Sequence, residues 1–261
     1  INFLINGFCM GVCSGFAIPV AQRFGAENYP SLRRFVANSV WLSVGFSIVM
    51  TFFVTIFCKQ ILILMNTPAN ILDQAYAYIV IIFVGIPVTY LYNLTSGIIR
   101  SLGDSKTPVY FLLLASGLNI ILDLIFIMGF HMGVGGAAIA TVISQLVSGI
   151  LCVYFMAKKF PILHMTREEW KFSKRHAEIL WANGLPMGLQ YSITAIGSII
   201  LQTAVNGLGS DSVAAVTAAT KLTMFLACPF DSLGTTMATY GGQNVGAMKL
   251  VRLKEGLKAS S

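Results

Sequence analysis

Residues 108–128 read PVYFLLLASGLNIILDLIFIM, a run of 21 residues with one charged side chain, Asp123. A helix of about 20 mostly apolar residues crosses a hydrocarbon core about 30 Å thick. The run also lacks the alternation of apolar and polar residues that a membrane β-strand shows. It therefore predicts a transmembrane helix.

Six further apolar runs of similar length flank this one. The composition agrees, because 56% of the 261 residues are hydrophobic and only 10% are charged, whereas about a quarter of the residues of a soluble domain are charged. We predict an all-α membrane protein, a polytopic bundle with seven spans. The other six cover approximately residues 1–21, 35–58, 76–99, 135–157, 179–205 and 212–240.

Basic residues gather in alternate loops, which gives the expected orientation. Short cytoplasmic loops collect Lys and Arg, and 15 of the 17 bases follow the first, third, fifth or seventh span. We therefore expect a multi-pass protein of the plasma (inner) membrane, with Ile1 outside and the C-terminal tail in the cytoplasm. The net charge of +7 is then a signal of topology, and no nucleic-acid partner is expected.

Similar sequences follow the first and the seventh span. Residues 21–34 read AQRFGAENYPSLRR and residues 241–255 read GGQNVGAMKLVRLKE. At an offset of 221 positions, both copies share a Q-x-x-G-A pattern, and both lie at the cytoplasmic end of a span. The two spans are six helices apart, so the repeats run parallel, as in transporters built from two six-helix halves. The matched pairs are Gln22 with Gln243, Gly25 with Gly246, Ala26 with Ala247 and Leu32 with Leu253.

The segment Ile98–Pro108 (IIRSLGDSKTP) resembles the loop between the fourth and fifth helices of the multidrug and toxic compound extrusion (MATE) family. The two Q-x-x-G-A segments resemble the ends of that family's second and eighth helices. The resemblance covers essentially the whole chain and implies a two-lobed, twelve-helix antiporter. It would export amphipathic or cationic organic compounds while Na⁺ or H⁺ enters, without a cofactor, and it would work as a monomer in the lipid bilayer.

The same resemblance divides the chain. Residues 1–157 would hold family helices two to six of the N-lobe, residues 158–178 the cytoplasmic linker, and residues 179–261 helices seven and eight of the C-lobe. The first helix and the last four would be missing, which agrees with a chain that opens inside a span without an initiator methionine. In the linker, the sequence TREE at residues 166–169 fits a capping box. It opens either an amphipathic surface helix, with Trp170 and Phe172 toward the lipid boundary, or a solvated basic loop.

Asp123 is the main candidate for ion coupling, because a charge inside the bilayer is costly and functional by default. Asn119 precedes it by one helical turn, and Thr141 is expected at the same depth as Asp123 on the next helix. These oxygen groups suit Na⁺, or a carboxyl group that binds a proton. The set resembles the N-lobe cation site of the DinF-like MATE branch, whose further aspartate belongs to the missing first helix. The alternative is that Asn119 and Asp123 only bond neighbouring helices.

The last two spans carry candidates for the substrate cavity. Asp231 is expected near the middle of the membrane and Lys221 near an interface. Gln190 and Thr194 are the polar groups where the NorM-like branch has a glutamate, which favours the DinF-like interpretation. Prolines in the spans predict kinks at Pro87 and Pro229.

Two smaller patterns indicate packing. Gly7, Gly11 and Gly15 recur every four residues and predict one smooth helix face for close packing. The five cysteines all lie in apolar spans without a C-x-x-C pair, and we interpret them as small buried hydrophobic residues.

Three other functions were weighed. A flippase for lipid-linked oligosaccharides, from the same superfamily, would share the two halves but would need several cationic groups in its cavity, where only Lys221 is available. A retinal protein would place its lysine deeper and would not explain the repeat. An enzyme is not expected, because the histidines lie in loops and no catalytic set is evident.

Overall fold

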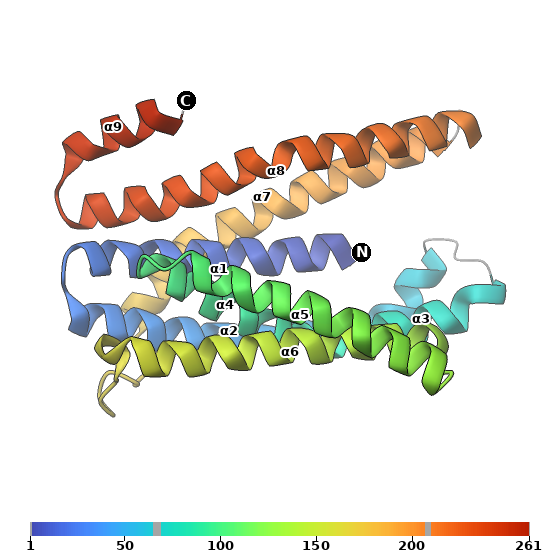
Figure 1. Ribbon diagram of the computed structural model, residues 1–261, viewed down its shortest axis with the longest axis horizontal. Coiled ribbons are helices and arrows are strands. Elements are labelled where there is room, and N and C mark those ends of the chain that lie inside the picture. The colour runs from blue at the N-terminus through green and yellow to red at the C-terminus, as the bar shows by residue number, and fades with distance from the viewer. Residues whose placement is uncertain (1, 65–68, 207–209, 261) are drawn as a thin grey trace.

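The computed structural model describes residues 2–64, 69–206 and 210–260. Within these ranges the chain is almost entirely helical and contains no strand (Figure 1), as the apolar runs predict. The helices are α1 (Asn2–Gly25), α2 (Tyr29–Leu64), α3 (Ala69–Val84), α4 (Ile86–Ser101), α5 (Lys106–Leu124), the π-helical turn η1 (Ile125–Gly129), α6 (Gly133–Lys159), the 3₁₀ turn η2 (Pro161–Leu163), α7 (Lys174–Asn206), α8 (Ser210–Gly246) and α9 (Leu250–Ser260).

Five of the described helices are long and apolar enough to cross a membrane: α1, α2, α5 with η1, α6 and α7. The pair α3 and α4 meets the same criteria when taken together, with a bend of 42° at the break between the two helices. The expected span at 76–99 is thus two helices, and the break at Gly85 and Pro87 confirms the predicted kink, because proline removes a helical hydrogen bond. Pro229 lies inside α8, which continues through it. The seventh predicted span corresponds to the 37-residue α8, which is not among the helices found over the described residues.

α1 is the centre of the fold and packs against α7, α4, α8 and α2. Val12, Phe16 and Val20 recur at helical spacing on its buried face. The predicted glycine face is confirmed. A Cβ on Gly11 would meet the backbone of Gly188 and one on Gly15 the backbone of Gly184, both at less than 3.0 Å. The glycines therefore let α1 and α7 cross in backbone contact.

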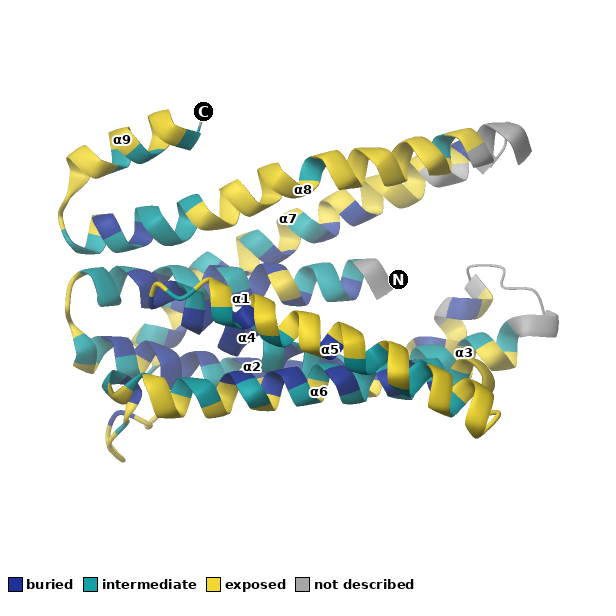
Figure 2. Ribbon diagram, viewed as in Figure 1, coloured by how far each residue is buried: buried dark blue, intermediate teal, exposed yellow. Residues whose placement is uncertain are grey.

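The outer faces of the bundle are apolar and exposed, as expected of helices that meet lipid (Figure 2). Only 6% of the most apolar stretch of α5 is buried, against 56% for α1. Four of the five cysteines are buried, as predicted, but Cys228 is exposed. The prediction is wrong there because Cys228 lies on a stretch of α8 whose surface is largely uncovered in this chain.

The two ends of the bundle differ in charge. One end lies on the left of Figure 1, and we call it the basic end. There α1, α4, α6 and α8 end, and α2, α5 and α7 begin. Arg23, Arg100, Lys158 and Lys159 lie in the last turns of helices there. The α5–η1–α6 hairpin turns at the opposite end. In Figure 1, α7 and α8 lie against α1 near the basic end and diverge from α5 and α6 toward the other.

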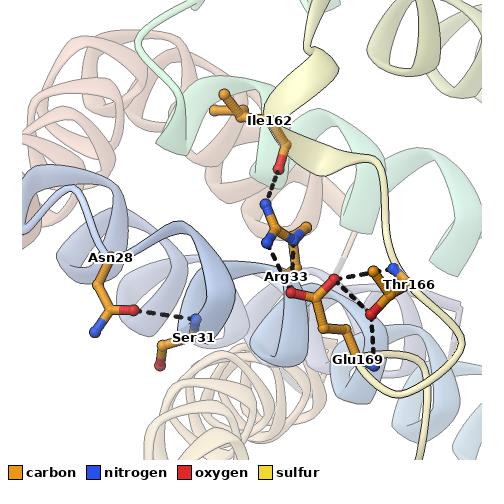
Figure 3. Close-up of polar contacts among 6 residues, drawn as sticks. All are labelled: Asn28, Ser31, Arg33, Ile162, Thr166 and Glu169. Carbon is orange, nitrogen blue, oxygen red and sulfur yellow. Dashed lines mark hydrogen bonds and ion pairs between the residues drawn. The ribbon is translucent and has the colours of Figure 1, made fainter.

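The segment between α6 and α7 closes over the basic end of α2. Its capping box forms as predicted, since Thr166 N donates to Glu169 Oε2 (2.9 Å) and Glu169 N to Thr166 Oγ1 (3.4 Å). The box closes a single turn rather than a surface helix, so the loop alternative is the correct one. Glu169 also forms an ion pair with Arg33 of α2, with Arg33 Nη2 and Glu169 Oε1 2.7 Å apart (Figure 3).

Candidate functional site

The α5–α6 hairpin brings two of the three expected coupling residues together. Asn119 Nδ2 lies 3.5 Å from Thr141 Oγ1, and Thr141 Oγ1 donates to the carbonyl oxygen of Ala137 at 2.9 Å. The sequence placed Thr141 level with Asp123, whereas its contact is with Asn119, one turn farther from the hairpin. The difference arises because α6 begins at Gly133, two residues before the expected start at residue 135, so Thr141 lies deeper in the helix.

Asp123 is partly buried, and its Oδ1 is fully buried without a hydrogen-bond partner among the described residues. A buried carboxylate oxygen without a donor is costly, and binding a proton or a cation removes that cost. The helix changes directly after this residue, because the π-helical turn η1 begins at Ile125. Turns of this kind are frequent at functional sites. A coupling role for Asp123 stays a prediction.

The candidates on α7 and α8 lie apart from this group. Gln190, Thr194, Lys221 and Asp231 are all exposed, and Thr194 Oγ1 bonds back to the carbonyl oxygen of Gln190 at 3.0 Å. In the described part of the chain, no hydrogen bond or ion pair joins these four to the coupling candidates of α5 and α6.

The two Q-x-x-G-A segments meet each other at the basic end, which we name the basic-end closure. A Cβ on Gly25 would overlap the carbonyl oxygen of Gln243, and a Cβ on Gly246 would overlap that of Gln22. The contact is reciprocal, as across a two-fold axis. Glycine at both positions therefore allows α1 and α8 to touch backbone to backbone.

The local structure repeats at the same offset of 221. Each helix ends in a Schellman motif, in which Asn28 N donates to Arg23 O (3.0 Å) and Lys249 N to Asn244 O (2.9 Å). The left-handed residues are Glu27 (φ 54°) and Met248 (φ 57°), although neither is a glycine. Two copies with the same hydrogen bonds and backbone support the internal repeat more strongly than the four identities do.

Ser101 ties a third helix to this closure. Its buried Oγ donates to the carbonyl oxygen of Ala17 on α1 at 2.9 Å, and its own carbonyl oxygen accepts from Gln243 Nε2 at 2.8 Å. Just inside the closure, the space left between α1, α4, α7 and α8 is only about 30 Å³. It is lined by Ser14, Ala17, Ile18, Gly97, Arg100, Met187, Thr235, Ala238 and Thr239.

Comparison with known proteins identifies the family. The family model MatE matches residues 1–125 and 186–260. The chain belongs to the MatE family. It is 30% identical over 260 residues to the probable multidrug resistance protein YoeA of Bacillus subtilis, covering 97% of this chain and 56% of that protein. It is 28% identical to the DNA damage-inducible protein F of Escherichia coli, covering 87% of the chain and 50% of that protein.

Solved structures agree on the fold. A MOP superfamily transporter from Pyrococcus furiosus superposes with a TM-score of 0.92 at 24% identity, over 99% of this chain and 57% of that one. The MatE chain described here thus spans about half the length of the curated relatives it matches. The expected fold class, an all-α membrane protein of the MATE transporter type, is therefore confirmed.

Sequence reasoning missed several residues of these sites. The sequence indicates Arg33 only as a loop base and Ser101 only as part of a motif, yet both make long-range contacts at the basic end. Their partners are 136 and 84 residues away, so no local pattern indicates them. The contact between the two Q-x-x-G-A segments is different, because the repeated sequence indicates that the two segments are related.

Proposed function

We propose that this MatE chain is part of a cation-coupled antiporter that exports drugs or other amphipathic or cationic organic compounds by alternating access. The buried Oδ1 of Asp123, which has no hydrogen-bond partner among the residues that the structure describes, carries the proposal, because it gives H⁺ or Na⁺ a binding group inside the bilayer. Asn119 and Thr141, one turn away, supply further oxygens suited to a hard cation.

The arrangement of the lobes supports a transport cycle. Residues 1–157 form the N-lobe helices, 158–178 the cytoplasmic linker and 179–261 the start of the C-lobe. With the basic end and the C-terminal tail in the cytoplasm, the basic-end closure is the shut inner gate. Binding of an ion at Asp123 changes the free-energy difference between the inward-open and the outward-open state. The affinity for the substrate changes with it.

The substrate class comes from the relatives. Similar proteins carry the names multidrug resistance protein and multidrug export protein, and Lys221 is the cationic candidate in the C-half, which disfavours the flippase for lipid-linked oligosaccharides. Asp231, Gln190 and Thr194 are proposed to face the substrate cavity of the full-length monomer.

Ethidium efflux by the full-length protein tests the coupling role. Asp123→Asn keeps the size of the side chain but cannot change charge, so we expect efflux driven by a Na⁺ or H⁺ gradient to fall at least about tenfold. Asp73→Asn, at an exposed position of α3, is the matched control and should retain efflux within about a factor of two. Wild-type efflux of several dyes by a well-expressed Asp123→Asn variant would refute the proposal.

A further inference from the structure

A pocket of about 190 Å³ lies at the basic end, between the first turns of α2 and α7 and the last turn of α1. We name it the arginine pocket. It is separate from the Asp123 group and borders the basic-end closure, because Arg23 belongs to the Q-x-x-G-A segment of α1. Its lining consists of Arg23, Ser31, Phe35, Arg175, His176 and Ile179.

Positive side chains surround this pocket without acidic partners. The Arg23 guanidinium lies 5.7 Å from the centroid of the Phe35 ring, and the His176 ring meets the same phenyl ring edge-on at 4.7 Å. Arg34 and Arg175 are also close enough for their charges to act on His176. In the part of the chain that the structure describes, no ion pair involves Arg23, Arg34 or Arg175.

Glu178 and Glu169 are paired with bases outside the lining of the pocket. Glu27 lies exposed in the turn between α1 and α2, without an ion pair among the described residues. Glu178, three residues after Arg175, lies 4.0 Å from Lys174. Glu169 of the neighbouring turn is held by Arg33. Among the described residues, no carboxylate forms an ion pair with the arginines of the pocket, so their positive charge is not neutralised.

Two helix N-termini add to this charge. α2 begins at Tyr29 and α7 at Lys174, and neither has an acid in its first turn. The helix dipole makes each N-terminus partly positive. At α2 the first N–H groups already have acceptors, since Ser31 N donates to Asn28 Oδ1 at 3.2 Å and Tyr29 N to the carbonyl oxygen of Glu27 at 3.1 Å. A cation is disfavoured there, so Arg175 at the start of α7 costs stability unless an anion joins it.

These observations together point to one ligand chemistry: we infer that the arginine pocket binds a phosphate group carried by an anionic phospholipid. Guanidinium groups bind phosphate oxygens in pairs of parallel hydrogen bonds. Ser31 supplies a hydroxyl. His176 Nδ1 lies 2.8 Å from Ser173 Oγ, which leaves Nε2 for the ligand.

The surroundings favour a lipid over free phosphate. Phe35 and Ile179 give the pocket an apolar wall, against which a glycerol backbone can pack. The basic end faces the cytoplasmic leaflet by the distribution of Lys and Arg, and that leaflet carries the anionic head groups.

Thermal unfolding of the full-length protein in neutral detergent tests the inference. Dihexanoyl phosphatidylglycerol should raise the Tm of the wild type, because a ligand that binds only the folded state stabilises it. Arg175→Gln should weaken the apparent affinity for this lipid at least about tenfold. Without lipid the same variant should keep or raise the Tm, because it removes a cation from a helix N-terminus. A merely structural role for Arg175 would lower the Tm in both conditions and would contradict the proposal.

Two controls complete the design. Lys254→Gln removes one exposed charge of α9 and should change the lipid affinity by less than about twofold. Dihexanoyl phosphatidylcholine should not raise the wild-type Tm. Equal effects of the two lipids, an equal loss in Lys254→Gln, or inorganic phosphate binding as tightly as the lipid would overturn the assignment.

Discussion

At the scale of single residues, the Arg33–Glu169 pair gives a prediction about pH. Hydrogen bonds from Arg33 and from Thr166 lower the pKa of Glu169 from 4.5 to about 2, and the side chain is only 10% exposed. The folded state therefore favours the charged carboxylate. The stability it contributes is fully present above pH 4.5 and is lost as the pH falls toward 2.

Glu169→Gln should accordingly lower the free energy of unfolding by about 1–2 kcal/mol at neutral pH. The difference from wild type should shrink as the pH falls from 4.5 toward 2, because the unfolded wild type binds a proton in this range. Near pH 2 the folded wild type also carries a neutral group. Thermal unfolding in detergent at a series of pH values measures this. Glu168→Gln removes the neighbouring charge without breaking the pair, and a pH profile that it alters as much as Glu169→Gln does would rule out the assignment.

The residues of this site also show how far the sequence reaches. The Thr166–Glu169 capping box was predicted because its two partners are three residues apart. Arg33 could not be assigned as the partner of Glu169, because the contact depends on how the linker folds back over α2. Asp123 is predictable because it is the only charged residue in an apolar run. Its depth relative to Thr141 is not, because that depth depends on which residue begins α6.

At the scale of elements, the crossing of α1 and α7 rests on small residues. A Cβ on Gly15 would lie 2.5 Å from the backbone of Asn183 and Gly184, and backbone cannot yield as a side-chain tip can. Gly15→Leu should destabilise the protein by about 1–3 kcal/mol. Chemical unfolding in mixed micelles, followed by the fluorescence of Trp181, which packs against Phe16, reports the loss.

Gly117→Leu is the matched control, because a Cβ at that position of α5 meets nothing within 4 Å. Leucine has the higher helix propensity, so this variant should be neutral or slightly more stable. Equal destabilisation by both substitutions would mean that helix geometry, not the close crossing, sets the cost.

Elements were more predictable than their contacts. Apolar length and charge gave the positions of the helices, since each span is a local property of the chain. The spacing of Gly7, Gly11 and Gly15 gave the packing face of α1, but its partner helix was not assigned, although Gly184 and Gly188 have the same spacing of four. The break between α3 and α4 followed from Pro87, while its 42° bend is set by packing against neighbouring helices.

At the scale of the whole molecule, the reciprocal contact of Gly25 with Gln243 and of Gly246 with Gln22 predicts how the closure opens. Any side chain at residue 246 overlaps the carbonyl oxygen of Gln22, so Gly246→Leu must push α1 and α8 apart. Because the two contacts are related by the repeat, Gly25→Leu should have the same effect. Both should shift the population toward states that are open at the basic end.

Accessibility of Ser14, which lines the small space just inside the closure, measures that shift. In a background without native cysteines, Ser14→Cys is labelled with a membrane-impermeant maleimide added on the side that the basic end faces. Each glycine variant should raise the labelling rate at least about fivefold. Gly234→Leu, on the same helix with nothing within 4 Å of its Cβ, should leave the rate within about a factor of two. A rise with only one of the two closure variants would show that the repeats do not share the gate equally, since a two-fold contact fails from either side in the same way.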